Sequence, residues 1–580
     1  MAKGESLGVA LPPQTRPGKE SFDIRSGPLA KWLRELPVGN TGETTKQLYQ
    51  ALLDVNRHSH SWQRRYRFLE AIREPLDGVQ RSLERRYSGL GFPLPAKSQQ
   101  IATLSLRFHT EMAHGYLAAI EGMLASLFLL QDRRALKVMV HRATRYLNLS
   151  LLVSYQTYSQ QPAAIWHQLH RLYSFAEARG FHQDPISDAL FEALPESSIA
   201  RIYKQIALLA TTSPFRLRQG EAATIHQALA RWSAHAKLLH PTENGAKTAL
   251  FAIHLDGDEE PNYRAMDNCP CDTNCRLIDT HQMVLLLKEE TGFAGGAAGK
   301  LAPELWCNLL QGWESPPKRS EHRSQGGIDI ELVVGMNQIH ALLAPTLQTG
   351  ALRDTRANFE ARPLHSGERR DNGNDIWNIH AAPGGNNRPG GSAQRQTPAA
   401  PQLAEAKVLH WQARDISSGG LRIAQADGQV CGMRVGELLA LRSEQQNHWQ
   451  LGQVRWLRRT GEDGLECGVQ LLAAQVVAVM VTHHAPGRAP GESQRGLLLP
   501  EDAELAQPAT LLASPRLFAQ ADKVLLHTPD NKFEAVLDGA IQENGTFVQF
   551  RFHAGTEPVA YSPDTLGGDA QANENVWEIL

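Results

Sequence analysis

The chain has 580 residues, which is the length of three or four domains because a single hydrophobic core does not grow to that size. Hydrophobic residues make up 42% and charged residues 21%, a composition typical of soluble globular proteins. The 59 basic and 61 acidic side chains nearly cancel to a formal charge of -2, which argues against a protein that binds DNA or RNA through a broad basic surface. A small phosphate-bearing ligand stays possible, since two or three arginines are enough to bind one.

The first 40 residues are rich in proline, glycine and charge, so we expect a disordered tail over residues 1–40. They contain no apolar stretch of signal-peptide length. The most apolar stretch of the chain, residues 117–130, contains Glu121 and falls short of the roughly 20 residues of a transmembrane helix. The six cysteines are too few to crosslink the chain and are expected to be reduced thiols. These features predict a cytoplasmic protein without a transmembrane segment.

From about residue 41 the apolar side chains follow a helical period. The i, i+3, i+4, i+7 spacing of one buried helix face is shared by Leu48, Ala51, Leu52 and Val55. Strand-like alternation is scarce before residue 245, which predicts an all-α N-terminal domain of packed antiparallel helices. We assign residues 41–312 to this domain, including a mixed end, and expect it to dock a protein partner.

The mixed end contains a candidate strand at residues 250–255 and a helix or strand at 281–290. It also contains the cysteine cluster CPCDTNC. Together with His281, the cluster would supply a zinc site of three cysteines and one histidine. Its irregular spacing lacks the paired CxxC of a zinc ribbon and favours reduced loop cysteines, so we assign no metal site. The cysteines in question are Cys269, Cys271 and Cys275.

From residue 328 the period of the apolar side chains changes to two. Ile328, Ile330 and Leu332 alternate with acidic residues, as in a half-buried strand. Five later stretches, separated by turn residues, follow the same pattern: 407–413, 420–424, 437–442, 449–457 and 466–472. Short antiparallel strands with such turns predict a small β-barrel, which we assign to residues 315–482.

The predicted barrel contains a long interruption. Apart from four prolines, residues 382–401 hold no apolar side chain larger than alanine, and they cannot bury enough surface to offset the entropy of ordering them. We therefore expect a disordered insertion at about 345–404. Residues 483–498 are predicted to be a linker, and residues 499–580 a small C-terminal β unit with a tail. The strands of that unit are expected at 522–528, 532–541 and 546–552.

Two short motifs carry the candidate chemistry. Arg319 and Arg323 lie four residues apart just before the first predicted strand, and the turn DISSGG supplies Asp415, Ser417 and Gly420. Paired arginines alone usually form a solvated face, and DxSxxG alone is a common turn. The two motifs together, in this order and flanking alternating strands, are much more specific.

On these residues the segment 315–482 resembles the PilZ family of bacterial cyclic di-GMP receptors, whose signature is RxxxR before the barrel and [D/N]xSxxG on its surface. Glycines at positions 436, 452 and 468 also stand where the family usually has them. The resemblance implies that cyclic di-GMP is contacted by Arg319, Arg323, Asp415, Ser417 and Gly420, with Lys318 and Gly419 as neighbours. Arginine suits this ligand, because guanidinium groups bind phosphate oxygens and guanine edges in pairs and stack on bases.

The expected fold is thus an all-α domain followed by a PilZ-like β-barrel and a small C-terminal β unit. The expected function is a cyclic di-GMP receptor that couples nucleotide binding to the helical domain. The family points to motility, pili or biofilm as the regulated process. No catalytic residue and no cofactor besides the ligand is expected. Two alternatives are a structural adaptor whose barrel does not bind nucleotide and an enzyme, although no nucleophile and base stand out in the sequence.

Overall fold

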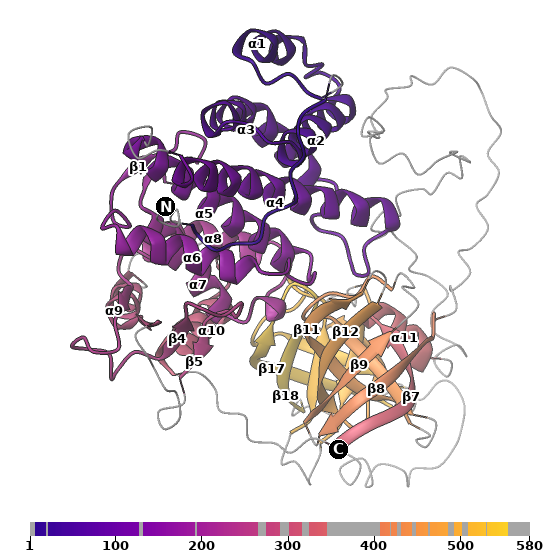
Figure 1. The fold of residues 1–580 in the computed structure, drawn as a ribbon. Helices are drawn as coiled ribbons and strands as arrows, with labels where there is room; N and C mark the ends of the chain where they lie inside the picture. Colours follow the sequence, from indigo (N-terminus) through magenta and orange to yellow (C-terminus); the bar gives the residue numbers. More distant parts are fainter. Residues whose placement is uncertain are drawn as a thin grey trace, which may run out of the picture. The chain divides into compact units, whose positions relative to one another are not determined.

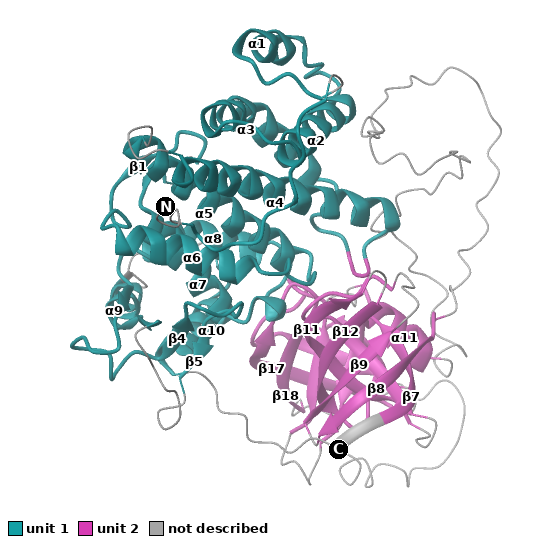
Figure 2. Cartoon of the chain, viewed as in Figure 1, with its two compact units in different colours: residues 1–90, 94–320, 373–387 teal, residues 91–93, 321–372, 388–580 magenta. Residues whose placement is uncertain are grey.

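The computed structural model of the chain divides into two compact units, coloured separately in Figure 2. The residues that the structure describes are 6–18, 21–126, 132–191, 194–264, 274–290, 301–315, 324–344, 406–417, 419–425, 431–443, 448–461, 464–484, 492–501, 508–528 and 531–554.

The first unit is helical, and it contains the described residues up to 315 apart from 91–93, which group with the second unit. Most of its described residues lie in helices (Figure 1). They are α1 Ser26–Glu35, α2 Thr41–Arg57, α3 Trp62–Glu84, α4 Ala96–Leu124, α5 Arg133–Gln156, α6 Ile165–Ala178, α7 Ile199–Thr211, α8 Glu221–Trp232, α9 His281–Glu290 and α10 Pro303–Glu314, with a 3₁₀ turn at Pro214–Arg216. The prediction of an all-α N-terminal domain is confirmed.

Helix α4 packs against both α3 and α5. Phe108, Met112 and Tyr116 follow the i, i+4, i+8 spacing along one face of α4, and all three are fully buried. Helix α5 begins where Asp132 accepts hydrogen bonds from the backbone N–H groups of Arg134 and Ala135, at 2.9 and 3.1 Å. This cap satisfies donors that the first turn of a helix leaves unpaired.

Two small sheets complete the first unit. Strands β1 Ile186–Ser187 and β2 Glu196–Ser197 form a two-stranded pair. The second sheet has the order β3-β6-β4-β5, with β3 Lys237–Leu239, β4 Phe251–His254, β5 Asn262–Tyr263 and β6 Cys275–Asp279. The strand predicted at 250–255 is therefore confirmed, and the ambiguous segment 281–290 is the helix α9.

In the second unit, six strands close into an antiparallel barrel in the order β10-β11-β12-β9-β8-β7. Their bounds are β7 Ser324–Val334, β8 Leu409–Ser417, β9 Gly420–Gln425, β10 Leu438–Ser443, β11 Gln450–Thr460 and β12 Gly464–Ala473. Leu409, Trp411 and Ala413 of β8 are buried and alternate with exposed residues, as the period of two requires. The predicted small antiparallel barrel is confirmed.

The C-terminal β unit is confirmed too, and it is a second closed barrel of six strands in the order β13-β14-β15-β18-β17-β16. The strands are β13 Val477–His483, β14 Gln494–Leu499, β15 Thr510–Ala513, β16 Lys523–His527, β17 Lys532–Glu543 and β18 Val548–Ala554. Its interior contains the fully buried side chains of Val479, Leu511 and Leu537.

A short helix that the sequence patterns did not predict, α11 Met336–Leu343, packs against strands of both barrels. Its Met336 and Ile339 share one buried cluster with Leu438 of the first barrel and Phe547 of the second. The Nε2–H of His340, on the same helix, donates to the carbonyl oxygen of Val479 on β13 at 3.1 Å. The two barrels are therefore joined by a common hydrophobic core.

The prediction of a disordered tail over residues 1–40 is wrong for the described part of this segment. Residues 26–35 form α1, and Leu7 is 1% exposed. The Leu7 backbone N–H donates to Glu121 Oε1 at 2.8 Å, and its carbonyl accepts from Arg171 Nε at 2.8 Å. The few apolar residues of the segment are enough to pack it onto the helices, which its average composition did not reveal.

The boundary after the first barrel also needs correction. The sequence pattern predicts the end of that barrel at residue 482 and a linker at 483–498. In the structure, β13 Val477–His483 pairs with β14 and β16, so it already belongs to the second barrel. Strand β14 begins within the predicted linker, at Gln494. The glycine and proline residues between these two strands were taken for an interdomain linker, although they connect neighbouring strands of one barrel.

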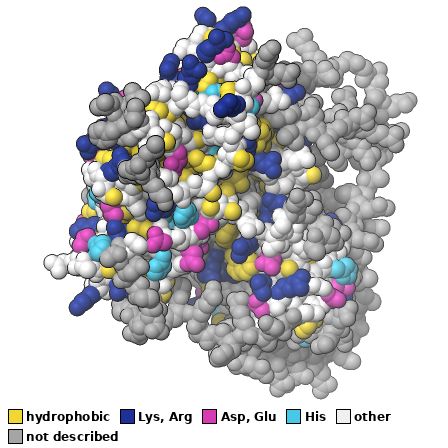
Figure 3. Space-filling view, viewed as in Figure 1, with side chains coloured by type: hydrophobic (Ala, Val, Ile, Leu, Met, Phe, Trp, Pro, Cys, Tyr) yellow, Lys and Arg dark blue, Asp and Glu magenta, His cyan; other side chains and the backbone are white. Residues whose placement is uncertain are grey.

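The predicted insertion at 345–404 lies outside the described residues, and so does the C-terminal tail beyond residue 554. In the part of the chain that is described, no helix is long and apolar enough to cross a membrane. Basic and acidic side chains are interspersed over the face drawn in Figure 3, as the nearly balanced charge of the chain leads one to expect.

Candidate functional site

The motif DISSGG forms the turn between β8 and β9, where Ser417 is paired with Gly420. The Ser417 hydroxyl donates to the carbonyl oxygen of Gly420 at 3.1 Å. The carbonyl oxygen of Gly419 accepts from the backbone N–H of Leu471 on β12 at 3.0 Å. The turn therefore lies where the sequence predicted it. It is stabilised by the hydrogen bond from Ser417 within the turn and by the one from Leu471 on the neighbouring strand.

Glycine is required at position 420 by close packing. A Cβ atom there would lie 2.2 Å from the carbonyl oxygen of Val469 on the neighbouring strand β12. Real Cβ atoms are not found so close to a backbone atom, so the strand would have to move. The glycine of the motif therefore has a structural role in bringing the turn against β12, whatever the turn binds.

Asp415 forms an ion pair that the sequence analysis missed. It lies directly opposite Arg422 across β8 and β9, and Arg422 Nε is 2.7 Å from Asp415 Oδ2. The Asp415 side chain is 15% exposed and that of Arg422 is 40% exposed, so the guanidinium can reach a ligand on the surface. A guanidinium has five N–H donors, which allows it to contact a carboxylate and a further acceptor.

The ion pair continues into a row of side chains across four strands. Arg422 is paired with Gly468 on β12, and Gly468 with Trp456 on β11. A Cβ at Gly468 would lie 1.9 Å from Trp456 Nε1, so the indole rests directly on the glycine backbone. Asp415, Arg422 and the half-buried Trp456 thus line one stretch of the barrel wall. Only the strand register identifies Arg422 and Trp456 as neighbours of the motif.

The predicted ligands Arg319 and Arg323, and their neighbour Lys318, lie outside the described residues. The residue that follows Arg323 in the chain, Ser324, is the first of β7 and is paired with Ile416 of the motif. The structure thus brings together Asp415, Ser417 and Gly420, and it does not test the two arginines.

The cysteine cluster is described only in part. Cys269 and Cys271 lie outside the described residues, and the Cys275 side chain is buried at the start of β6. His281 is exposed at the first position of α9. Within the described ranges, histidine, cysteine, aspartate and glutamate side chains do not gather into a group that could hold a metal ion.

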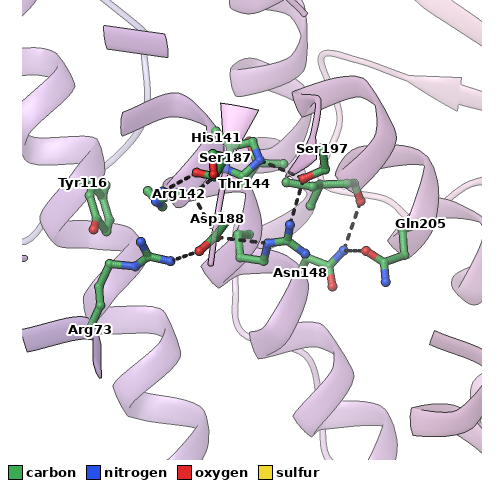
Figure 4. A network of polar contacts seen from close by, with 12 residues as sticks. Arg73, Tyr116, His141, Arg142, Thr144, Asn148, Ser187, Asp188, Ser197 and Gln205 are labelled. Carbon is green, nitrogen blue, oxygen red and sulfur yellow. Dashed lines mark hydrogen bonds and ion pairs between the residues drawn. The ribbon is translucent and has the colours of Figure 1, made fainter. Parts of the chain in front are cut away.

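The helical unit contains a buried polar network around Asp188 (Figure 4). Asp188 is 1% exposed, and its carboxylate accepts from Arg73 at 2.5 Å and lies 2.8 Å from Arg142. Arg145, whose pKa is lowered by burial to about 10, donates to the Ser197 hydroxyl at 3.0 Å. Arg142 also donates to the Ser187 carbonyl at 2.9 Å. The arginines of α3 and α5 thereby hold strands β1 and β2, which is a structural role.

In comparisons with known proteins, three family models together match nearly the whole chain. The model described as the N-terminal domain of the cyclic-di-GMP receptor FimW matches residues 27–242, and that of its middle PilZ domain matches 250–477. The model of the FimW C-terminal beta-barrel domain matches 477–554 and thus begins at the first residue of β13. The chain is 26% identical to the cyclic-di-GMP receptor FimW of Pseudomonas aeruginosa, over 95% of this chain and 94% of the relative. No solved structure matches the chain.

Proposed function

The chain belongs to the FimW family of PilZ-domain proteins, and from this premise we propose that it is a receptor that binds cyclic di-GMP on its first barrel. The observation that carries the proposal is the row of Asp415, Arg422 and Trp456 beside the motif turn. These side chains offer a hydrogen-bond acceptor, a guanidinium and an aromatic ring, which are the groups that recognise a guanine nucleotide.

In the proposed complex, Arg319 and Arg323 bind the phosphates and guanine edges, and Asp415 and Ser417 bind a guanine edge or ribose. Gly420 allows the turn to lie close to the ligand. To these residues we add Arg422, which would exchange part of its contact with Asp415 for a contact with the nucleotide. We also add Trp456, whose indole would stack on a base, since every base has an aromatic face.

We further propose that the protein binds rather than converts its ligand, and that it acts in the cytoplasm. Nucleotide binding would regulate a protein partner docked on the helical unit, in the control of motility, pili or biofilm. Ligand-linked coupling requires that the nucleotide binds one arrangement of the chain more tightly than another. A pull-down from a lysate with and without cyclic di-GMP tests this part of the proposal, and a set of captured proteins that does not change with nucleotide would contradict it.

Isothermal titration calorimetry of the full chain with cyclic di-GMP tests the receptor function. We expect binding heat at micromolar nucleotide, and we expect Arg319→Ala and Asp415→Ala each to abolish or greatly weaken it. The absence of heat from the unmodified chain would favour the alternative, an adaptor whose barrel does not bind nucleotide. Unchanged affinity in both variants would overturn the assignment of the site residues while leaving the receptor function in place.

A further inference from the structure

The second unit contains a pocket of about 560 Å³ with walls from both barrels, a volume within the usual range for small-molecule sites. One wall is the end of β12 and the chain that follows it. The other is formed by the C-terminal barrel. The first wall includes Gln470 and Leu471, and the second includes Glu501, Gln542 and Gln549.

The pocket adjoins the motif turn. Gln470, which lines it, is the direct cross-strand partner of Gly420, and its Cα would lie 3.3 Å from a Cβ at that position. The next lining residue, Leu471, donates its backbone N–H to the Gly419 carbonyl oxygen at 3.0 Å. A ligand seated on the turn therefore has the pocket immediately beside it, across one strand of the barrel.

The lining of the pocket suits a base better than a phosphate. Its charged side chain is Glu501, which would repel a phosphate, and the other polar groups are mainly glutamine amides. Two of these amides use Nε2 within the protein. Gln549 donates to Thr510 Oγ1 at 3.0 Å, and Gln542 donates to Gln453 Oε1 at 3.2 Å. Their carbonyl oxygens, like the Glu501 carboxylate, are acceptors for N–H groups of a ligand.

Among the common bases, guanine matches a pocket rich in acceptors. Its Watson–Crick edge presents two adjacent donors, N1–H and N2–H₂, and a carboxylate accepts both. Adenine presents an acceptor at N1, which a carboxylate would repel. The apolar part of the lining includes Leu472 and Ile541, the latter 46% exposed, and such side chains pack against the face of a base.

We propose that this pocket is the subsite for one guanine of the nucleotide bound at the turn, so that the C-terminal barrel forms part of the ligand site. The inference rests on the proposed receptor function and extends it. It gives the second barrel a role in binding and specificity, with Glu501, Gln542 and Gln549 as the residues that recognise the base.

Calorimetry with cyclic di-GMP on the full chain tests the subsite through two variants. Ala474→Trp introduces a bulky ring at an exposed position of the lining, which avoids a folding defect, and it should lower the affinity at least tenfold. Glu501→Gln should lower it about tenfold, as expected for the loss of one paired contact to a base edge. Gln494→Ala, on β14 but away from the pocket, is the matched control and should bind like the unmodified chain.

Binding of a second ligand, cyclic di-AMP, distinguishes a change in base recognition from a loss of folding. Glutamine at position 501 both donates and accepts, so Glu501→Gln should bind cyclic di-AMP more tightly than the unmodified chain does. A loss of fold would weaken both nucleotides instead. Wild-type affinity for cyclic di-GMP in both Ala474→Trp and Glu501→Gln, with Asp415→Ala still impaired, would overturn the subsite alone. Absence of binding by the unmodified chain would overturn the receptor function itself.

Discussion

Asp415 and Arg422 face each other across the hairpin of β8 and β9, with Arg422 Nε 2.7 Å from Asp415 Oδ2. The carboxylate that the motif supplies is thus already paired with a guanidinium. Since the Arg422 side chain is 40% exposed, solvent screens the pair and its own contribution to stability is small. The pair instead fixes where the guanidinium lies, next to the surface on which the nucleotide is proposed to bind.

Replacing Arg422 with alanine should therefore weaken cyclic di-GMP binding much more than it weakens the fold. We expect at least a tenfold loss of affinity by calorimetry, because a hydrogen bond to a charged group contributes about 1.5–3 kcal/mol. The control is Arg442→Ala, which removes the guanidinium of another cross-strand pair in the same barrel, with Glu331 at 2.5 Å. Equal affinities of the two variants would contradict a role of Arg422 in binding.

Trp456→Ala should also weaken binding, because stacking of a base on an aromatic side chain contributes about 1–3 kcal/mol. Trp456→Phe keeps an aromatic face and should lose less. Trp449→Phe is the matched control, because Trp449 is also half-buried but lies outside the row of Asp415, Arg422 and Trp456. Its indole is instead 4.6 Å from the Arg442 guanidinium on β10. Stacking of a base on the Trp456 indole should quench the tryptophan fluorescence of the unmodified chain. Quenching that persists in full in Trp456→Phe would contradict stacking on Trp456.

Gly420→Ala should loosen the barrel at the turn. The added methyl group would meet the Val469 carbonyl oxygen at 2.2 Å, and such overpacking costs about 1–3 kcal/mol or more. Hydrogen exchange followed by mass spectrometry resolves the effect locally, and amides of β9 and β12 should exchange faster. Gly327→Ala, on β7 with open space around its Cβ position, should exchange like the unmodified chain. Slow exchange in Gly420→Ala would show that the strand accommodates the methyl group.

The strands of the first barrel were predictable because alternation and turn residues act over a few neighbouring positions. Helix α11 was missed, since its eight residues are too short to establish a period beside the insertion. In the site, Asp415, Ser417 and Gly420 lie within one short motif. Arg422 and Trp456 become neighbours only through the pairing of β9, β12 and β11, and a sequence alone does not give the order of strands in a barrel.

Asp188→Asn should strongly destabilise the helical unit. It would leave three buried arginines around a neutral side chain, and breaking a buried ion pair from one side costs about 3–5 kcal/mol. Urea unfolding followed by circular dichroism at 222 nm reports on this unit, because the helices dominate that signal. Asp77→Asn, which removes the partner of Arg81 in an exposed pair on α3, should cost about 1 kcal/mol or less. Similar losses in both variants would contradict the role assigned to Asp188.

Buried histidines should make the stability of the helical unit depend on pH. Burial lowers the pKa of His109 and of His226 to about 3, and that of His170 to about 4. In the unfolded chain a histidine has a pKa of about 6.5, so between pH 6.5 and 4 the unfolded state binds protons that the folded state does not. The free energy of unfolding should therefore fall as the pH falls, by up to about 1.4 kcal/mol per pH unit for each histidine.

His226→Gln tests this dependence at a single position. The Nε2–H of His226 donates to Asn148 Oδ1 at 2.5 Å, and a glutamine amide also has a donor for that contact. The variant loses the group that titrates, so its stability should fall less steeply between pH 7 and pH 5, by about 1.4 kcal/mol per pH unit at most. Urea unfolding at pH 7, 6 and 5 measures the slope independently of any loss of stability at neutral pH. A slope equal to that of the unmodified chain would contradict the prediction. It would mean that His226 has the same pKa in the folded and unfolded states, because only then does a group contribute nothing to the pH dependence of stability.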